Sequence, residues 1–342
     1  MTDTLMKSPA SVALKKPRLG FLGVGWIGRH RMEAMLATGR VEAAAVVDPS
    51  DQNAEDALAL DPTAERVGSF EEMLSLGLDG VVIATPSALH AEQSIQALEA
   101  GLAVFCQKPL GRSEAEVRAV VDCAREADRL LAVDLSYRFT EGMRRIRDLT
   151  AGGSLGQIFG VDLTFHNAYG PDKPWFYDPR LSGGGCVMDL GVHMVDLALW
   201  ALDWPEVVDV QARLFAKGRP LEDQEACEDY AVATLTLASG AAVRVACSWG
   251  LAAGKDAEIG AAFYGSEGGA VLRNVDGSFY DFTAERTSGQ RSERLCSPPD
   301  AWGGRAAADW ARRLADGQGH DPDTDRLVEV ARVLDRIYGR RP

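Results

Sequence analysis

The chain has 342 residues, of which 46% are hydrophobic and 25% charged, and its formal net charge at pH 7 is −14. A chain of this length and composition is expected to form about two globular domains. The negative charge repels phosphate backbones and anionic lipid headgroups, and no apolar run approaches the roughly 20 residues that span a bilayer, so we expect neither nucleic acid nor a membrane as a partner.

The N-terminal segment, residues 1–16, mixes charged residues and proline without a continuous apolar stretch. It resembles neither a signal peptide nor a membrane anchor, and we expect a flexible tail. The six cysteines form no C-x-x-C pair, which argues against a zinc site or a disulfide scaffold. They are Cys106, Cys123, Cys186, Cys227, Cys247 and Cys296. Reduced thiols and a cytoplasmic location are the simplest interpretation.

Residues 17–136 alternate short apolar runs with amphipathic stretches, which is the pattern of a parallel sheet with crossover helices. The expected strands are Arg18–Val24, Val41–Asp48, Gly80–Ala84, Ala103–Cys106 and Leu130–Asp134. The expected helices are Arg29–Ala37, Ser69–Leu76, Leu89–Ala100 and Ser113–Ala127. Gly101 stands where a helix C-cap is expected, and Ser113 with Glu116 makes a capping box. This segment is predicted to be an α/β Rossmann domain.

A glycine-rich loop, Gly23-Val24-Gly25-Trp26-Ile27-Gly28, ends the first strand and opens the first helix. In a dinucleotide-binding loop the three glycines serve a tight turn, backbone approach to the pyrophosphate and close helix packing, and the helix N-terminus faces the anion. Taken alone, the spacing also fits a purely structural turn. We expect Gly23, Gly25, Trp26, Ile27 and Gly28 to bind the cofactor.

Asp48 closes the second strand twenty residues after Gly28. A carboxylate at this place can accept hydrogen bonds from the adenosine ribose hydroxyls, although a plain turn residue before Pro49 is the alternative. Residues 49–56 contain no Arg or Lys to hold a ribose 2′-phosphate. NAD is therefore favoured over NADP.

Beyond residue 136 the strand-like runs become longer and few helices separate them. The expected strands are Ile158–Phe165, Val207–Phe215, Tyr230–Leu237, Ala241–Trp249, Ile259–Gly265 and Ala270–Arg273, and the clearest helices are Asp189–Leu202, Arg305–Ala315 and Thr324–Tyr338. This pattern predicts that residues 137–342 form an α+β domain with a mostly antiparallel sheet.

Three further motifs, read together with the glycine loop, resemble the Gfo/Idh/MocA family of oxidoreductases. They are Ala84-Thr85-Pro86-Ser87-Ala88-Leu89-His90, Gln107-Lys108-Pro109, and the run Gly183-Gly184-Gly185-Cys186-Val187-Met188-Asp189-Leu190-Gly191-Val192-His193-Met194-Val195-Asp196. The resemblance covers residues 17–340. It implies a Rossmann domain followed by an α+β domain whose open sheet often makes the subunit interface, hence a homodimer or homotetramer. It also implies a nicotinamide-dependent exchange of hydroxyl and carbonyl groups on sugars or cyclitols.

The resemblance places Thr85, Pro86 and His90 along the cofactor cleft. The turn that carries them leaves the carboxyl end of the expected sheet, where ligands of open α/β folds bind. His90 could equally be a histidine packed on its own helix, since one helix position does not define chemistry.

Lys108 matches the lysine of the family's Glu-Lys-Pro motif, and it follows a strand end that faces the ligand crevice. There its ammonium can stabilise negative charge on a reacting oxygen, the alternative being a solvated surface lysine. Gln107 stands where the family usually has Glu. We expect Gln107 and Lys108 to lie among the cofactor-binding residues, with the positioning around the nicotinamide and the lysine altered by the loss of the carboxylate.

Asp189 and His193 lie four residues apart, so on a regular helix they share a face with Asp196. The Gly183–Gly185 run before them is expected to let the backbone approach a ligand closely. We expect Asp189 to orient the His193 ring and stabilise its protonated form, and His193 to exchange a proton with a substrate hydroxyl near neutral pH. A purely structural pair, or an Asp-His-Asp metal cluster, are the alternatives. We expect Lys108, Asp189 and His193 to act together, without a metal.

Candidate substrate-binding residues combine aromatic faces for sugar C–H patches with polar tips for hydroxyls. They are Tyr137, Arg138, His166, Asn167, Tyr169, Trp175 and Arg180, of which Tyr137, His166, Trp175 and Arg180 are preferred. Any of them could instead be structural, because Trp and Tyr also fill protein cores.

The sequence therefore predicts an oxidoreductase that transfers a hydride between nicotinamide and a sugar, sugar derivative or cyclitol. Two rival functions stay open. Some relatives use bound NAD transiently to hydrolyse glycosides, and a few bind a dinucleotide and regulate transcription without catalysis.

Overall fold

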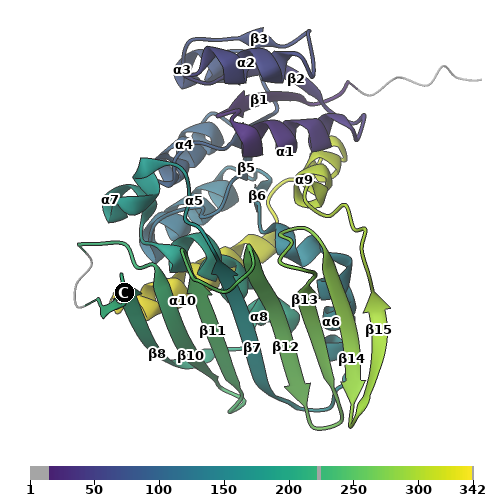
Figure 1. Ribbon diagram of the computed structural model, residues 1–342. Coiled ribbons are helices and arrows are strands. Elements are labelled where there is room, and N and C mark those ends of the chain that lie inside the picture. The colour runs from purple at the N-terminus through teal and green to yellow at the C-terminus, as the bar shows by residue number, and fades with distance from the viewer. Residues whose placement is uncertain (1–14, 222–224, 341–342) are drawn as a thin grey trace, which may run out of the picture.

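The computed structural model describes residues 15–221 and 225–340, so most of the predicted 1–16 tail lies outside the described residues. The N-terminal elements are β1 (Arg18–Leu22), α1 (Trp26–Leu36), β2 (Glu42–Val47), α2 (Asp51–Leu58), β3 (Glu65–Arg66), α3 (Phe70–Leu74), β4 (Gly80–Ile83), α4 (Ser87–Glu99), β5 (Ala103–Cys106), α5 (Glu114–Glu126) and β6 (Leu131–Val133). They form the upper part of the molecule in Figure 1.

These strands make a six-stranded parallel sheet in the order β3-β2-β1-β4-β5-β6. Helices cover both faces, which is why β4 and β5 are buried along their whole length. The predicted Rossmann domain is confirmed. The strand order reverses between β1 and β4, so a ligand crevice is expected outside their carboxyl ends.

The boundaries of some elements differ from the prediction. Helix α1 begins at Trp26 rather than Arg29, and α2 and β3 were not predicted. Helix α2 has the sequence DQNAEDAL, whose polar composition hides its apolar face of Ala54 and Ala57, and β3 has only two residues. The Ser113 hydroxyl accepts a hydrogen bond from the Glu116 backbone N–H at the start of α5, which is one half of the predicted capping box. The Glu116 carboxylate accepts instead from the Arg112 backbone N–H.

The second part of the chain builds a nine-stranded sheet. Its strands are β7 (Ile158–Asn167), β8 (Val207–Ala216), β9 (Arg219–Pro220), β10 (Tyr230–Leu237), β11 (Ala242–Ser248), β12 (Ala257–Gly265), β13 (Gly269–Asn274), β14 (Phe282–Ser288) and β15 (Arg291–Cys296). The order is β15-β14-β13-β12-β7-β11-β10-β8-β9, and only the β7–β11 pair is parallel. The mostly antiparallel sheet is confirmed, with the edge strands β9 and β15 and the strand β14 added to the expected ones.

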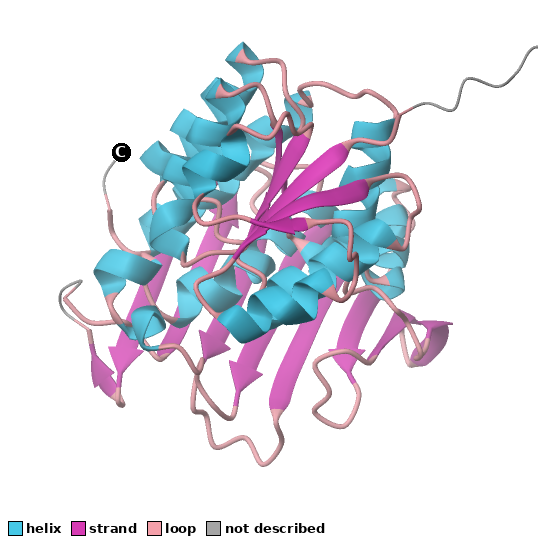
Figure 2. Cartoon of the chain, turned by 90° about the horizontal axis from the view of Figure 1, so that it is seen from above, coloured by secondary structure: helices cyan, strands magenta, loops and turns pink. Residues whose placement is uncertain are grey.

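One face of this sheet packs on helices and the other is open. The helices of the second part are η1 (Ser136–Phe139), α6 (Glu141–Ala151), η2 (Pro174–Tyr177), α7 (Pro179–Ser182), η3 (Val187–Gly191), α8 (Val192–Ala201), α9 (Arg305–Ala315), η4 (Pro322–Thr324) and α10 (Asp325–Ile337). Helices α6, α8 and α10 pack on one face of the larger sheet, and no helix of the described residues covers its other face (Figures 1 and 2). Helix α6 was not predicted, because RRIRD gives it a polar appearance.

The last two long helices return to the Rossmann domain. Helix α9 packs on α1, and its Trp310 is fully buried with its ring 5.8 Å from that of Phe105. Helix α10 packs on α5 and on α8. A boundary at residue 136 therefore separates the two sheets but does not separate two independent packing units.

A single helical stretch among the described residues, Pro179–Ala201, is long and apolar enough to cross a membrane, and 89% of its apolar window is buried inside the fold. Its buried residues belong to the hydrophobic core under the larger sheet. Its middle is a π-helical turn, Val187–Gly191, followed directly by α8.

Candidate active site

A cleft of about 460 Å³ lies between the start of α1, the carboxyl ends of β5 and β6, and the second domain. Its floor carries Lys108, Tyr137 and His193, and its far wall carries Tyr280 and Trp302. The carboxyl ends of parallel strands thus meet the π-helical turn and α8, where the resemblance predicts the site.

The glycine loop has the shape that a dinucleotide requires. A side chain at Gly23 would lie 2.6 Å from the Ala84 carbonyl oxygen, and one at Gly28 would lie 2.1 Å from the Gly23 carbonyl oxygen, so both glycines serve backbone packing. A Cβ at Gly25 meets only the Asn53 amide, at 3.8 Å. Helix α1 has no side-chain cap at Gly25 and no acidic residue in its first turn. Open space beside uncapped N–H groups suits a pyrophosphate.

Asp48 lies beside this loop and supports it. Its carboxylate accepts hydrogen bonds from the backbone N–H groups of Val24, at 2.8 Å, and Ser50, at 2.9 Å. Arg66, which the sequence analysis overlooked, approaches from β3: its guanidinium lies 2.6 Å from an Asp51 oxygen and 3.5 Å from the Asp48 carbonyl oxygen. A cation therefore stands near the expected ribose position, and a carboxylate already holds it.

His90 ties two turns together from beneath the cleft. Its ring nitrogens lie 2.7 Å from the carbonyl oxygens of Pro109 and Thr85, and the residue is 1% exposed. Burial lowers its pKa, and the hydrogen bonds to the two backbone carbonyls oppose that shift. The packed-histidine alternative describes His90 better than a contact to the cofactor does. The Thr85 hydroxyl donates to Gln93, and Pro86 precedes α4.

Lys108 and Asp189 join the two domains at the cleft. The Lys108 Nζ donates to both the Oδ1 and the backbone carbonyl of Asp189, each at 2.6 Å. The indole N–H of Trp249, at the end of β11, donates to Asp189 Oδ2 at 3.0 Å. Both carboxylate oxygens of Asp189 are thereby engaged. Trp249 was missed because it ends an apolar strand and shows no motif.

No hydrogen bond joins His193 to Asp189 among the described residues, so the expected orienting pair is not formed. The π-helical turn that contains Asp189 breaks the regular spacing on which a shared face depends. The His193 Nδ1 is buried without a hydrogen-bond partner among the described residues, and Tyr137 packs edge-on against the ring at 4.9 Å. Burial, followed by the charges of Lys108 and Arg31, lowers the pKa of His193 well below 6.5. The imidazole is held neutral, contrary to the expected stabilisation of its protonated form.

Asp196 also turns away from the predicted cluster. Its carboxylate forms a bidentate pair with the Arg138 guanidinium, one bond of which measures 2.7 Å. Arg138 is thereby removed from the candidate substrate contacts, and the three members of the Asp-His-Asp alternative face different partners. This arrangement gives no support to a metal site there.

The Gly183–Gly185 run contacts protein rather than the cleft, so its expected role in ligand approach is also wrong. Buried Glu228 accepts hydrogen bonds from the backbone N–H groups of Gly185, at 2.9 Å, and Val187, at 2.8 Å. The Tyr338 hydroxyl donates to Glu228 at 2.8 Å and accepts from the Met188 N–H at 3.2 Å. Together these contacts fix the turn that carries Asp189.

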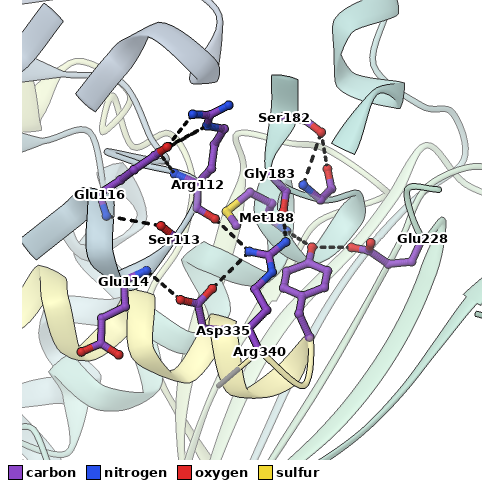
Figure 3. A network of polar contacts seen from close by, with 12 residues as sticks. Arg112, Ser113, Glu114, Glu116, Ser182, Gly183, Met188, Glu228, Asp335 and Arg340 are labelled. Atoms are coloured by element: carbon purple, nitrogen blue, oxygen red, sulfur yellow. Dashed lines mark hydrogen bonds and ion pairs between the residues drawn. The ribbon is translucent and has the colours of Figure 1, made fainter. Parts of the chain in front are cut away.

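Arg340 extends this network to the segment that follows Lys108. Its guanidinium donates to the carbonyl oxygens of Arg112, at 2.8 Å, and Gly183, at 2.5 Å (Figure 3). Asp335 holds Arg340 and also accepts from the Glu114 N–H at the start of α5. The segments that carry Lys108 and Asp189 are thus tied to the same C-terminal helix. Sequence reasoning missed Glu228, Tyr338 and Arg340, because no local motif marks them.

The four preferred substrate-binding residues divide into two groups. Tyr137 lines the cleft. The Trp175 ring stacks on the Phe176 ring with their centroids 3.8 Å apart, and Phe176 packs edge-on against Trp249. His166 instead donates to or accepts from Ser248 on the open face of the sheet, and the Arg180 side chain is 87% exposed and paired with Asp178. His166 and Arg180 are therefore not brought to the site.

The chain matches two family models. Residues 17–135 match the Gfo/Idh/MocA oxidoreductase family, NAD-binding Rossmann fold, and residues 143–271 match the Gfo/Idh/MocA C-terminal domain. D-xylose 1-dehydrogenase (NADP(+)) 2 of Haloferax volcanii is 30% identical over 325 residues, which cover 93% of this chain and 95% of that protein. D-glucoside 3-dehydrogenase of Escherichia coli (strain K12) is 29% identical over 214 residues, 58% of this chain.

The matched segment spans only 60% of the length of the D-glucoside 3-dehydrogenase. Among solved structures, a levoglucosan dehydrogenase in complex with NADH and levoglucosan superposes with a TM-score of 0.80 at 22% identity, covering 95% of this chain and 97% of that one. This likeness concerns the fold.

Proposed function

This chain belongs to the Gfo/Idh/MocA family of oxidoreductases, and we propose that it transfers a hydride between a nicotinamide cofactor and the hydroxyl-bearing carbon of a sugar, sugar derivative or cyclitol. The contact that carries the proposal is the 2.6 Å pair between Lys108 and Asp189. It joins the Rossmann domain to the second domain beside His193, where a cofactor and a substrate could meet.

The chemistry that a bound nicotinamide dinucleotide supplies is the donation or acceptance of the hydride. Lys108 holds the substrate oxygen. Two of its ammonium protons point to Asp189, which leaves the third for that oxygen and its developing negative charge. Asp189 keeps the ammonium in place and its charge balanced.

His193 acts as the proton acceptor in the oxidative direction. Its ring is neutral at pH 7, so one nitrogen has a free lone pair for the proton of the substrate hydroxyl. The same surroundings that lower its pKa make the protonated ring a ready donor, which favours passing the proton on. Tyr137 holds the ring from its edge.

The aromatic wall of the cleft suits a polyhydroxylated substrate. Tyr137 and Trp302 have ring centroids 4.9 Å apart, and the Trp302 indole N–H donates to the Tyr280 carbonyl at 2.8 Å. Rings held in this way offer apolar faces to sugar C–H groups, and Tyr280 lines the same cleft.

We favour NAD over NADP as the cofactor. Asp48 brings a negative charge next to the glycine loop, and Arg66, the nearby cation, is paired with Asp51. A 2′-phosphate would have to compete with Asp51 for Arg66 and approach the Asp48 carboxylate. Titration of the protein with NADH and NADPH, followed by nucleotide fluorescence, tests this preference directly.

The decisive experiment is a screen of inositols, aldoses, amino sugars and uronic sugars with NAD and NADP, followed at 340 nm. We expect stoichiometric NADH with at least one compound, and an acidic limb of kcat/KM below pH 6.5, since the His193 pKa is lowered. Release of an aglycone without net NADH would identify NAD-dependent hydrolysis instead. Tight NADH binding without turnover of any compound would contradict catalysis.

The open face of the nine-stranded sheet is the expected subunit interface of a homodimer or homotetramer. Its centre is flat, because Thr164 of β7 is flanked by Gly260 of β12 and Ala246 of β11. A Gly260→Arg variant should therefore disrupt this interface and sediment with a lower molecular mass than the native protein.

The six free thiols suit the reducing cytoplasm.

A further inference from the structure

Gln107 belongs to a buried network that no motif predicts. Its side-chain Nε2 donates to Asp134 Oδ2 at 2.7 Å, and the Arg31 Nε donates to the same oxygen at 2.6 Å. The three residues are between 2% and 8% exposed. The positive charge of Arg31 balances the negative charge of Asp134, and the neutral Gln107 amide lies beside them.

The backbone explains why these side chains meet. The Gln107 N–H donates to the Ile83 carbonyl, and the Asp134 N–H donates to the Cys106 carbonyl at 2.9 Å, so both residues continue neighbouring parallel strands past their carboxyl ends. Arg31 reaches them from α1, the helix that begins at the glycine loop. The network therefore joins α1 to the ends of β5 and β6 in the lining of the cleft.

An acidic residue at position 107 does not fit this network. Ionised Asp134 offers only acceptors, so the group that faces its Oδ2 must be a donor. A carboxylate in place of the Gln107 amide would bring one of its negative oxygens to about 2.7 Å from Asp134 Oδ2, with only the Arg31 guanidinium to balance both charges. Position 107 is where the family usually has Glu, and here the buried carboxylate comes from β6 instead.

We propose that Gln107 is a positioning residue, whose amide, through Asp134 and Arg31, fixes the strand end from which Lys108 reaches Asp189. Asp134 supplies the buried negative charge, and the Gln107 amide donates the hydrogen bond that stabilises this charge next to the strand end that carries Lys108. The inference rests on the proposed function only for the role of Lys108.

Other charged and titratable groups surround the network and remain the same in every variant. Within the fold these are His30 of α1, Cys106 of β5, Lys108, Tyr137 of η1 and His193 of α8, and Asp300 and Tyr280 lie across the cleft. His30 contacts Arg31 at 3.1 Å. A new pH dependence in a Gln107→Glu variant can therefore be assigned by comparison with the unaltered protein.

The test compares the native protein with Gln107→Glu, Asp134→Asn and the double variant Gln107→Glu/Asp134→Asn, with Gln290→Glu as a control at an exposed turn. Thermal unfolding is measured from pH 4.5 to 8.5 without any ligand, and kcat/KM is measured over the same range with the compound found in the screen. The first readout needs neither cofactor nor activity, so it stands even if the proposed reaction fails.

We expect Gln107→Glu to lose stability as the pH rises. The introduced carboxyl, next to Asp134, takes a proton more readily in the folded state than at the unfolded value of about 4.3. Its stabilising proton is present below that value and is lost as the pH rises through the raised folded pKa. Its kcat/KM should fall about tenfold or more at pH 8 and recover towards pH 5, because the protonated carboxyl is again a donor.

The double variant restores one carboxylate and one amide, so it should regain most of the loss and lose the new pH dependence. Asp134→Asn alone leaves Arg31 without its counter-charge and should be impaired at every pH. If Gln107→Glu follows the native pH profiles of stability and activity, or if the double variant is no better than Gln107→Glu, the proposal is overturned. Should Asp134→Asn fail to fold, the other two variants still decide the matter.

Discussion

Two glycine-rich segments, residues 23–28 and 183–185, each precede a helix at the candidate site, yet they contain glycine for different reasons. Gly25 in the first has open space where its Cβ would be. In the second, a Cβ at Gly184 would lie 2.0 Å from the Tyr338 hydroxyl and one at Gly185 2.0 Å from the Glu228 carbonyl. In the first segment Gly25 leaves room for a ligand while Gly23 and Gly28 serve backbone packing, whereas Gly184 and Gly185 in the second leave room only for the protein itself. The same sequence signal thus has two physical causes.

The comparison is tested most severely by Gly185→Ala. The new Cβ would collide with the backbone of Glu228, which cannot move as a flexible side-chain end can. We expect a loss of about 3 kcal/mol or more in the free energy of unfolding, measured by urea denaturation. Gly160→Ala, whose Cβ would meet only Tyr264 at ordinary contact distance, is the matched control. Equal free energies of unfolding for the two variants would show that Gly185 is not required for packing against Glu228.

The second segment and its partners hold the turn from which Asp189 contacts Lys108. Lys108→Met should lower kcat by about 100-fold while leaving the NADH dissociation constant within about twofold, because the side chain acts on the substrate oxygen. Lys217→Met, at an exposed turn, should keep native kinetics. A Lys108→Met enzyme with native turnover would show that the Lys108–Asp189 contact is structural only.

Gly25→Ala should affect binding and not folding. Its backbone dihedral angles, φ −58° and ψ −173°, are accessible to alanine, so we expect less than about 1 kcal/mol of lost stability. A methyl group in the space proposed for the pyrophosphate should weaken NADH binding about tenfold, as measured by fluorescence titration. Unchanged NADH affinity would mean that the ligand does not pass over Gly25.

Tyr338→Phe is the mildest change, and its effect should depend on pH. Burial raises the pKa of Glu228, while the backbone N–H groups and the Tyr338 hydroxyl oppose that rise. Without the Tyr338 hydroxyl, the pKa of Glu228 in the folded protein rises further. The free energy of unfolding then falls as the pH increases through that pKa. We expect a deficit of about 1 kcal/mol near pH 7 that shrinks near pH 5. A deficit independent of pH would indicate a packing defect instead.

The first segment could be predicted from the sequence because its constraints are local. A strand, three glycines and a helix follow one another, and Asp48 closes the neighbouring strand, so the chain alone sets the geometry. The strands β14 and β15 escaped prediction because they are partly exposed and lie at or next to the sheet edge, with charged residues, such as Arg291 and Glu293, that hide any alternation.

The second segment could not be predicted, because its geometry depends on distant residues. Glu228 and Tyr338 hold a turn whose sequence reads as a regular helix, and the π-helical turn separates Asp189 from His193. Spacing along the sequence predicted their contact only under regular helical geometry. The resemblance supplied Lys108 and Asp189 as candidates, and the contact between them depends on the packing of the two domains.

The return of α9 to the Rossmann domain limits how such genes can recombine. The Trp310 ring fills the space in which a side chain at Gly80 would stand, 2.9 Å away, so the parallel sheet is completed by a residue encoded after the second sheet. A dinucleotide-binding segment transplanted without that later helix would carry an uncovered apolar hollow. Inheritance of the two halves is therefore coupled, and new substrate preferences should arise by change within loops more readily than by exchange of whole modules.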